Sequence, residues 1–194
     1  MEGVISLTVG QPDFLTPWHI REAAITSLEK GKSFYTSNSG LIKFREAIAE
    51  YLDRRFDVKY NPKDEMIITV GGSEAIDLAI RAIVEPGDEV LIVEPSYVCY
   101  APMTQLTGGV PVAIPTRVED KFKLTPELLK KYITPKSKRL ILPYPNNPTG
   151  GIMTYEDLEK IVEVLKDKDI IVLSDEIYAE LTYGRKHRSI AEFE

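Results

Sequence analysis

Short apolar runs alternate with helical stretches along the last two thirds of the sequence. The apolar runs read as buried strands, and we expect them at residues 66–70, 90–93, 110–114, 140–142 and 170–173. The helical stretches between them are 73–84, 97–106, 126–132 and 155–166, the last opened by Thr154 with Asp157 in the relation of a capping box. Strands that alternate with helices predict an α/β fold with a mostly parallel sheet flanked by helices.

Two further helices are predicted before this alternation begins. In the first, Thr16 is expected to be the N-cap and Pro17 the first helical residue, and Gly31 ends the helix. The second is predicted by apolar residues on one helical stripe, which we expect to pack against a core. The stripe consists of Leu41, Phe44, Ala47, Ile48, Tyr51 and Leu52.

Composition narrows the class of function. The chain has 24 basic and 30 acidic residues, a net charge of −6, and no clustered Lys and Arg, which argues against binding to nucleic acid or to an anionic membrane. The single Cys99 cannot form an internal disulfide, and neither His19 nor His187 has partners at ligand spacing, so we expect no metal site. Residues 1–4 do not resemble a signal peptide and no apolar run spans a bilayer, so we expect a cytoplasmic location.

Ligands in parallel α/β sheets gather at the carboxyl ends of the strands, and the first candidate site lies there. The run 66–70 leads into Gly71-Gly72-Ser73-Glu74, where a helix begins. Glycines allow close approach of the backbone, and a helix N-terminus offers free amides to a phosphate. An ordinary turn with Ser73 as the N-cap explains the same residues equally well, and no nucleotide-binding glycine fingerprint is present.

Two more candidate sites follow later strands. The run 140–142 leads into a rigid turn with two prolines around Asn146 and Asn147, although Asn-Pro is also common turn chemistry. The run 170–173 delivers Asp175 and Tyr178. A carboxylate in that place needs a partner; in isolation, a helix N-cap would explain Asp175 and core packing would explain Tyr178.

Taken together, these motifs resemble the class I aminotransferases of the fold-type-I pyridoxal-phosphate family. The resemblance rests on residues 72–75, 147–150 and 174–178 in this order, and on two earlier segments. Residues 5–14 resemble the family's substrate-side loop, and Tyr35-Thr36 with Gly40 and Phe44-Arg45 resembles its tyrosine segment. The resemblance implies a three-layer large domain, here incomplete, with residues 1–35 as the N-terminal segment and first helix and 36–194 as part of the cofactor-binding domain.

The resemblance also implies roles for individual residues. The amides of Gly72, Ser73 and Glu74 would bind the phosphate of pyridoxal 5'-phosphate, Tyr97 would stack on its ring, and Asn147 and Tyr178 would hydrogen-bond its phenolic oxygen. Asp175 would face the ring nitrogen and keep it protonated, which makes the ring a better acceptor of electrons, so this contact matters most for the chemistry. Gly10 would meet the substrate carboxylate. Tyr35 would reach the cofactor phosphate of a partner subunit, which implies a homodimer.

Members of this family need a lysine that holds the cofactor covalently and moves a proton. In the family it follows the Asp-Glu-Ile-Tyr segment in a Ser-Lys or Ser-x-x-Lys setting, and no such motif follows Asp175 here. Lys186 comes too soon after Asp175, and we interpret it as a solvated loop residue. We therefore expect an N-terminal portion of an aminotransferase, without the C-terminal small domain and inactive alone. Without the family's later strands, the strand at residues 66–70 would lie two strand positions, roughly 10 Å, from the nearest strand of the sheet.

The predicted function is transfer of an amino group between an amino acid and a 2-oxo acid, within amino acid metabolism and biosynthesis. Three alternatives stay open. The same scaffold supports β-elimination by carbon–sulfur lyases, the chain could be a non-catalytic fragment, and a nucleotide-binding oxidoreductase is weakened by the absent fingerprint.

Overall fold

The computed structural model describes residues 5, 10 and 12–193 and divides the chain into two units, 1–37 and 38–194. In the first unit, helix α1 spans Trp18–Glu29 and none of its residues is buried. Pro17 is its N-cap and has an extended ψ of 141°, so the prediction of Thr16 as the N-cap was wrong by one residue. Gly31 follows the helix with a φ of 66°, a left-handed conformation that suits glycine and ends the helix as predicted.

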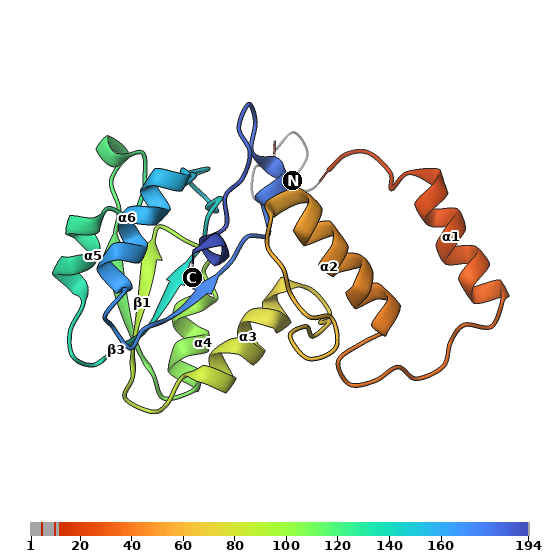
Figure 1. The fold of residues 1–194 in the computed structure, drawn as a ribbon, viewed down its shortest axis with the longest axis horizontal. Coiled ribbons are helices and arrows are strands. Elements are labelled where there is room, and N and C mark those ends of the chain that lie inside the picture. The colour runs from red at the N-terminus through yellow and green to blue at the C-terminus, as the bar shows by residue number, and fades with distance from the viewer. Residues whose placement is uncertain (1–4, 6–9, 11, 194) are drawn as a thin grey trace. The chain divides into compact units, whose positions relative to one another are not determined.

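The second unit contains a four-stranded parallel sheet in the order β2-β1-β3-β4 (Figure 1). The strands are β1 Glu89–Glu94, β2 Val110–Pro115, β3 Ser137–Leu142 and β4 Ile171–Ser174. The helices between and before them are α3 Gly72–Ile83, α4 Tyr100–Leu106, α5 Pro126–Tyr132 and α6 Tyr155–Leu165. The three-residue 3-10 turns are η1 Val118–Asp120, η2 Ala179–Leu181 and η3 Ile190–Glu192. The α/β class and the parallel sheet are confirmed.

The prediction of a strand at residues 66–70 is wrong for this structure. No strand is assigned there, and the Ile68 amide donates instead to the carbonyl of Ser39, at 3.1 Å. Ile67 is 66% exposed and Val70 is 94% exposed. The physical reason is that a strand needs a neighbour, and none of the strands in residues 12–193 pairs with this run.

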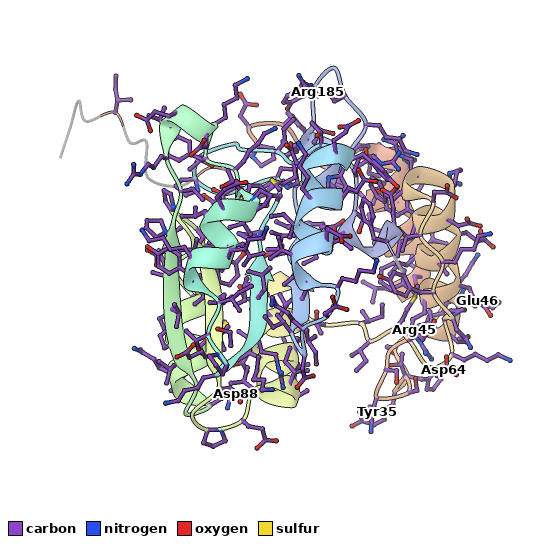
Figure 2. All side chains as sticks on the ribbon, turned by 60° about the vertical axis from the view of Figure 1, so that its left-hand side comes forward. Tyr35, Arg45, Glu46, Asp64, Asp88 and Arg185 are labelled. Atoms are coloured by element: carbon purple, nitrogen blue, oxygen red, sulfur yellow. The ribbon has the colours of Figure 1, made fainter. Side chains whose placement is uncertain are left out.

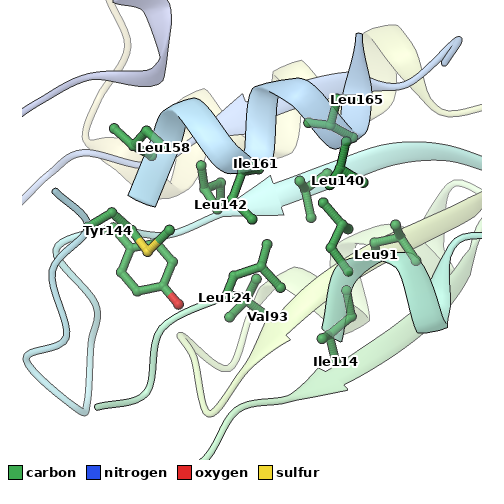
Figure 3. Close-up of a cluster of buried hydrophobic side chains, with 13 residues drawn as sticks. Leu91, Val93, Ile114, Leu124, Leu140, Leu142, Tyr144, Leu158, Ile161 and Leu165 are labelled. Atoms are coloured by element: carbon green, nitrogen blue, oxygen red, sulfur yellow. The ribbon is translucent and has the colours of Figure 1, made fainter. Parts of the chain in front are cut away.

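Neighbouring residues of the strands point to opposite faces of the sheet, and a cluster of buried side chains covers each face. Leu91 and Leu140 face the cluster under α5 and α6, which Figure 3 shows in close-up. Ile92 and Ile141 face a second cluster, to which α3 and α4 contribute Ile76, Ile80 and Tyr100. At the start of α6 the predicted capping box is present, with Thr154 and Asp157 each bonding the other's backbone amide. The carboxyl ends of the strands are therefore held by a core on each side.

Helix α2, Ile42–Phe56, was predicted to pack along an apolar stripe, and this was wrong. Leu41, Phe44 and Ala47 are exposed, and within the helix only Arg45 and Phe56 are buried. The polar contacts of α2 include those of Arg45, labelled in Figure 2, whose guanidinium donates to the carbonyls of Pro62 and Lys63, at 2.5 and 2.9 Å, and that of Arg55, which donates to Glu180. Its last residue, the buried Phe56, packs edge-on against the ring of His187.

Candidate active site

A pocket of about 230 Å³ lies at the carboxyl edge of the sheet, within the second unit. The loops after β1, β3 and β4 and the start of α3 all contribute to it. Its lining consists of Gly72, Ser73, Ile76, Tyr97, Tyr100, Pro143, Pro145, Asn147, Asp175, Ile177 and Tyr178. Residues that are more than 100 positions apart in the sequence thus meet in one cavity.

Most of the predicted cofactor contacts line this pocket, namely Gly72, Ser73, Tyr97, Asn147, Asp175 and Tyr178. Glu74 does not line it; its carboxylate accepts a hydrogen bond from the backbone of Val70. Tyr35 and Gly10 are exposed residues of the other unit, and their roles remain predictions. Residues 1–4, 6–9 and 11, which include most of the predicted substrate-side loop before Gly10, lie outside the described residues.

The turn before α3 is shaped to admit an anion. Gly71 is the N-cap and has a φ of 90°, a conformation that favours glycine. A Cβ atom built at Gly71 or Gly72 would meet nothing within 4 Å, so open space surrounds the turn. No side chain caps the helix, which rules out the ordinary interpretation of Ser73 as the N-cap. The first amides of a helix have no partner within it and carry partial positive charge, which suits a phosphate.

Asp175 is held in a defined orientation at the end of β4. Its backbone amide donates to the carbonyl of Leu142 at 3.1 Å, and its Oδ2 accepts from the Tyr100 hydroxyl at 2.7 Å. Its Oδ1 accepts from the amide of Ile177 at 3.2 Å. The alternative role of Asp175 as a helix N-cap is not observed, because the next helical turn, η2, begins only at Ala179.

Tyr100 is the functional candidate that the sequence analysis missed. Its side chain is buried, and burial together with the hydrogen bond to Asp175 raises the pKa of its phenol, so it keeps its proton and remains a donor. The Tyr97 ring packs edge-on against it, with centroids 5.8 Å apart. The three-residue spacing of Tyr97 and Tyr100 could have suggested a shared face near the start of the predicted helix.

The turn after β3 separates the roles of its two asparagines. The buried Asn146 forms the turn, since its Oδ1 accepts from the amide and the hydroxyl of Thr149, at 3.2 and 2.8 Å. Asn147 is exposed and lines the pocket. Turn formation, the alternative explanation of these asparagines, therefore applies to Asn146 and leaves the Asn147 side chain at the cavity.

Comparison with known proteins identifies the family. The model of the aminotransferases of class I and II matches residues 2–193. The chain belongs to this family. The Bacillus subtilis protein YugH is 51% identical over 191 residues, which are 98% of this chain and 50% of that protein. The aromatic-amino-acid aminotransferase 2 of Thermococcus litoralis is 43% identical, over 100% of this chain and 50% of that enzyme.

Solved structures agree with the family assignment. The aromatic aminotransferase of Pyrococcus horikoshii superposes with a TM-score of 0.96 at 44% identity, over 100% of this chain and 52% of that one. The chain spans about half the length of the aminotransferases that it matches. The predicted resemblance and the predicted fold are thereby confirmed.

The chemistry of the pocket fits pyridoxal 5'-phosphate, the cofactor that the family implies. The open N-terminus of α3 with the Ser73 hydroxyl fits a phosphate, and the carboxylate of Asp175 fits a protonated ring nitrogen. Tyr97 offers an aromatic face between these two ends.

Across residues 12–193, none of the helices is long and apolar enough to span a membrane.

Proposed function

We propose that this chain forms the cofactor-binding site of a pyridoxal-phosphate-dependent aminotransferase, which moves an amino group between an amino acid and a 2-oxo acid. The observation that carries the proposal is the convergence of six predicted cofactor contacts in one pocket: Gly72, Ser73, Tyr97, Asn147, Asp175 and Tyr178. The family assignment supports it, because two of the relatives named above, from Thermococcus litoralis and Pyrococcus horikoshii, are aromatic aminotransferases.

When bound, the cofactor supplies a ring that accepts the electrons released at the α-carbon of the substrate. The residues of this chain prepare that ring. The carboxylate of Asp175, oriented by the Tyr100 hydroxyl, would hold a proton on the ring nitrogen. Ser73 and the amides at the start of α3 would hold the phosphate, and Tyr97 would offer its aromatic face to the ring. Asn147 and Tyr178 would donate hydrogen bonds to the phenolic oxygen.

A covalent link to the cofactor needs a lysine, and none of the residues that line the described pocket is a lysine. We therefore propose that residues 1–194 alone bind the cofactor reversibly and are inactive. This observation also favours the second candidate, a non-catalytic fragment that binds cofactor without turnover. The amino-acid substrate, the homodimer and the cytoplasmic location remain parts of the proposal. Lys186 lines a separate pocket, together with Ser174 and Glu176.

The test is a titration with pyridoxal 5'-phosphate, read by visible absorbance before and after borohydride reduction. We expect saturable binding to residues 1–194 without a reduced lysine adduct at one mapped site. In the longest native polypeptide that carries this sequence, we expect one such adduct and transfer of nitrogen from aspartate or phenylalanine to 2-oxoglutarate. Release of pyruvate and ammonia would instead identify a lyase. Absence of binding in both proteins would refute the proposal.

A further inference from the structure

The segment after β4 carries Asp175, Ile177 and Tyr178 to the cofactor pocket, while the side chain of Glu176 is bonded elsewhere. Glu176 lines the separate pocket of about 190 Å³, whereas Asp175 and Tyr178 line the cofactor pocket. Neighbouring side chains therefore reach different cavities. The segment itself has little regular structure, since it is neither strand nor helix between Ser174 and Ala179.

The carboxylate of Glu176 bonds to side chains before and after it in the chain, up to 13 residues away. Its Oε1 accepts from the hydroxyls of Ser174 and Ser189, at 2.7 and 2.8 Å. Its Oε2 lies 2.8 Å from the Nε2 of His187. The carboxylate thus ties the end of β4 to residues 187–189, which follow the ten-residue segment 177–186 that contains η2.

Two of the partners of Glu176, His187 and Ser189, are buried and are themselves held, whereas Ser174 is exposed at the end of β4. The His187 side chain is 6% exposed, and its ring packs edge-on against Phe56 of α2, with centroids 5.4 Å apart. Ser189 is buried and also caps the short turn η3 through the amide of Ala191. A carboxylate bonded to three side chains, two of them buried, is a stronger anchor than an exposed ion pair.

A second carboxylate anchors the other end of the same segment. Glu180 accepts from Arg55 Nε at 2.8 Å and from the Tyr51 hydroxyl at 2.6 Å, so it is joined to α2. Tyr178 lies between the two anchored residues, Glu176 and Glu180. Of the two, Glu176 is the less exposed and is the direct neighbour of Asp175.

We propose that Glu176, together with His187 and Ser189, is a positioning site that holds Asp175 and Tyr178 in the cofactor pocket. The inference rests on the proposed function. Reacting groups lose much of their effect when they are misplaced by about 1 Å. Glu176 does not line the cofactor pocket, so its effect on cofactor binding passes through the backbone of residues 175–178.

The test compares Glu176→Ala with two other variants in the longest native polypeptide that carries this sequence. Glu176→Gln keeps an oxygen that can accept from both serines, and Glu163→Ala removes an exposed carboxylate of α6 as a matched control. We expect Glu176→Ala to raise the Kd for pyridoxal 5'-phosphate about 10-fold and to weaken the visible circular dichroism band of the bound cofactor. Glu176→Gln should recover part of both losses, and Glu163→Ala should resemble the wild type.

A cofactor-free readout separates positioning from simple destabilisation. With 3-fluorotyrosine incorporated, the fluorine signal of Tyr178, assigned with Tyr178→Phe, should shift in Glu176→Ala and stay unchanged in Glu163→Ala. A wild-type Kd, dichroism band and Tyr178 signal in Glu176→Ala, with only the urea midpoint lowered, would overturn the positioning role and leave the proposed function intact. If the wild type does not bind the cofactor, the proposed function fails, and an unshifted Tyr178 signal would then overturn the inference separately.

Discussion

Two apolar runs lead into the candidate active site, and they differ in how the structure supports them. Both runs, 66–70 and 140–142, have the composition of buried strands and end at a turn that lines the pocket. The second is the end of β3, where Leu140 is fully buried between β1 and β4. The first is unpaired, and its Ile67 and Val70 are largely exposed.

The difference shows that an apolar run becomes a strand only where the fold supplies a neighbour. Leu140 pairs in register with Leu91 on one side and Val172 on the other, and α6 covers it. In the first run, the Ile68 amide bonds to Ser39 of a loop. In the described structure, therefore, the runs that lead to Asn147 and Asp175 are paired in the sheet, whereas the run that leads to Ser73 is not, and support on that side comes from α3.

The largest expected effect is on stability at the supported run. Leu140→Ala should lower the free energy of unfolding by about 2–5 kcal/mol, because it removes a fully buried side chain from the centre of the sheet and leaves a cavity. Urea denaturation followed by far-ultraviolet circular dichroism measures it. A loss below about 1 kcal/mol would mean that the core around β3 is not packed as described.

A second prediction compares the two sides of the pocket in function. In the longest native polypeptide, Asp175→Asn should reduce turnover about 10- to 100-fold with a smaller change in cofactor affinity, because the charge that protonates the ring is lost while the shape is kept. Ser73→Ala should mainly weaken cofactor binding. Cofactor Kd and kcat, measured for both variants, check this. Equal effects on Kd and kcat in both variants would contradict the division of roles.

A third prediction concerns the cap of the helix that covers β3. Burial acts to raise the pKa of Asp157, but the Lys123 ammonium and the Thr154 amide and hydroxyl outweigh it and hold this pKa below its ordinary value. Asp157→Asn should cost about 1 kcal/mol at neutral pH. A carboxylate with a lowered pKa stabilises the fold above its unfolded pKa, and this stabilisation is lost as the pH falls through the folded value.

The difference between wild type and Asp157→Asn should therefore shrink below about pH 4, where the free carboxyl begins to protonate. Urea titrations at several pH values measure it, with Glu163→Ala on the same helix as the control. A difference that stays constant down to pH 2 would show that the charge of Asp157 is not involved.

The sequence predicted what depends on local pattern and could not predict what depends on distant partners. The capping box of Thr154 and Asp157 was predictable, because it needs only a spacing of three residues. The strand at residues 66–70 and the packed stripe of α2 were mispredicted, because pairing and burial depend on neighbours far along the chain. Only the family resemblance implied that residues 66–70 would lie away from a sheet neighbour. At the site, the place of Asp175 after a strand made it a candidate and the family resemblance suggested its role, whereas its donor Tyr100 is 75 residues away and needed the three-dimensional structure.

The smallest expected effect, at the unsupported run, tests the comparison most directly. In residues 1–194, Ile67→Thr should change the free energy of unfolding by less than about 0.5 kcal/mol, because the side chain is already mostly in water. The same substitution in the longest native polypeptide should cost more if additional chain pairs with residues 66–70 and buries Ile67. Hydrogen exchange adds a second measure: the amides of residues 66–70 should exchange much faster than those of Leu140 and Ile141. A loss above about 1.5 kcal/mol in residues 1–194, or slow exchange at residues 66–70, would show that the run is buried without a neighbouring strand and that the two sides of the pocket are equally supported.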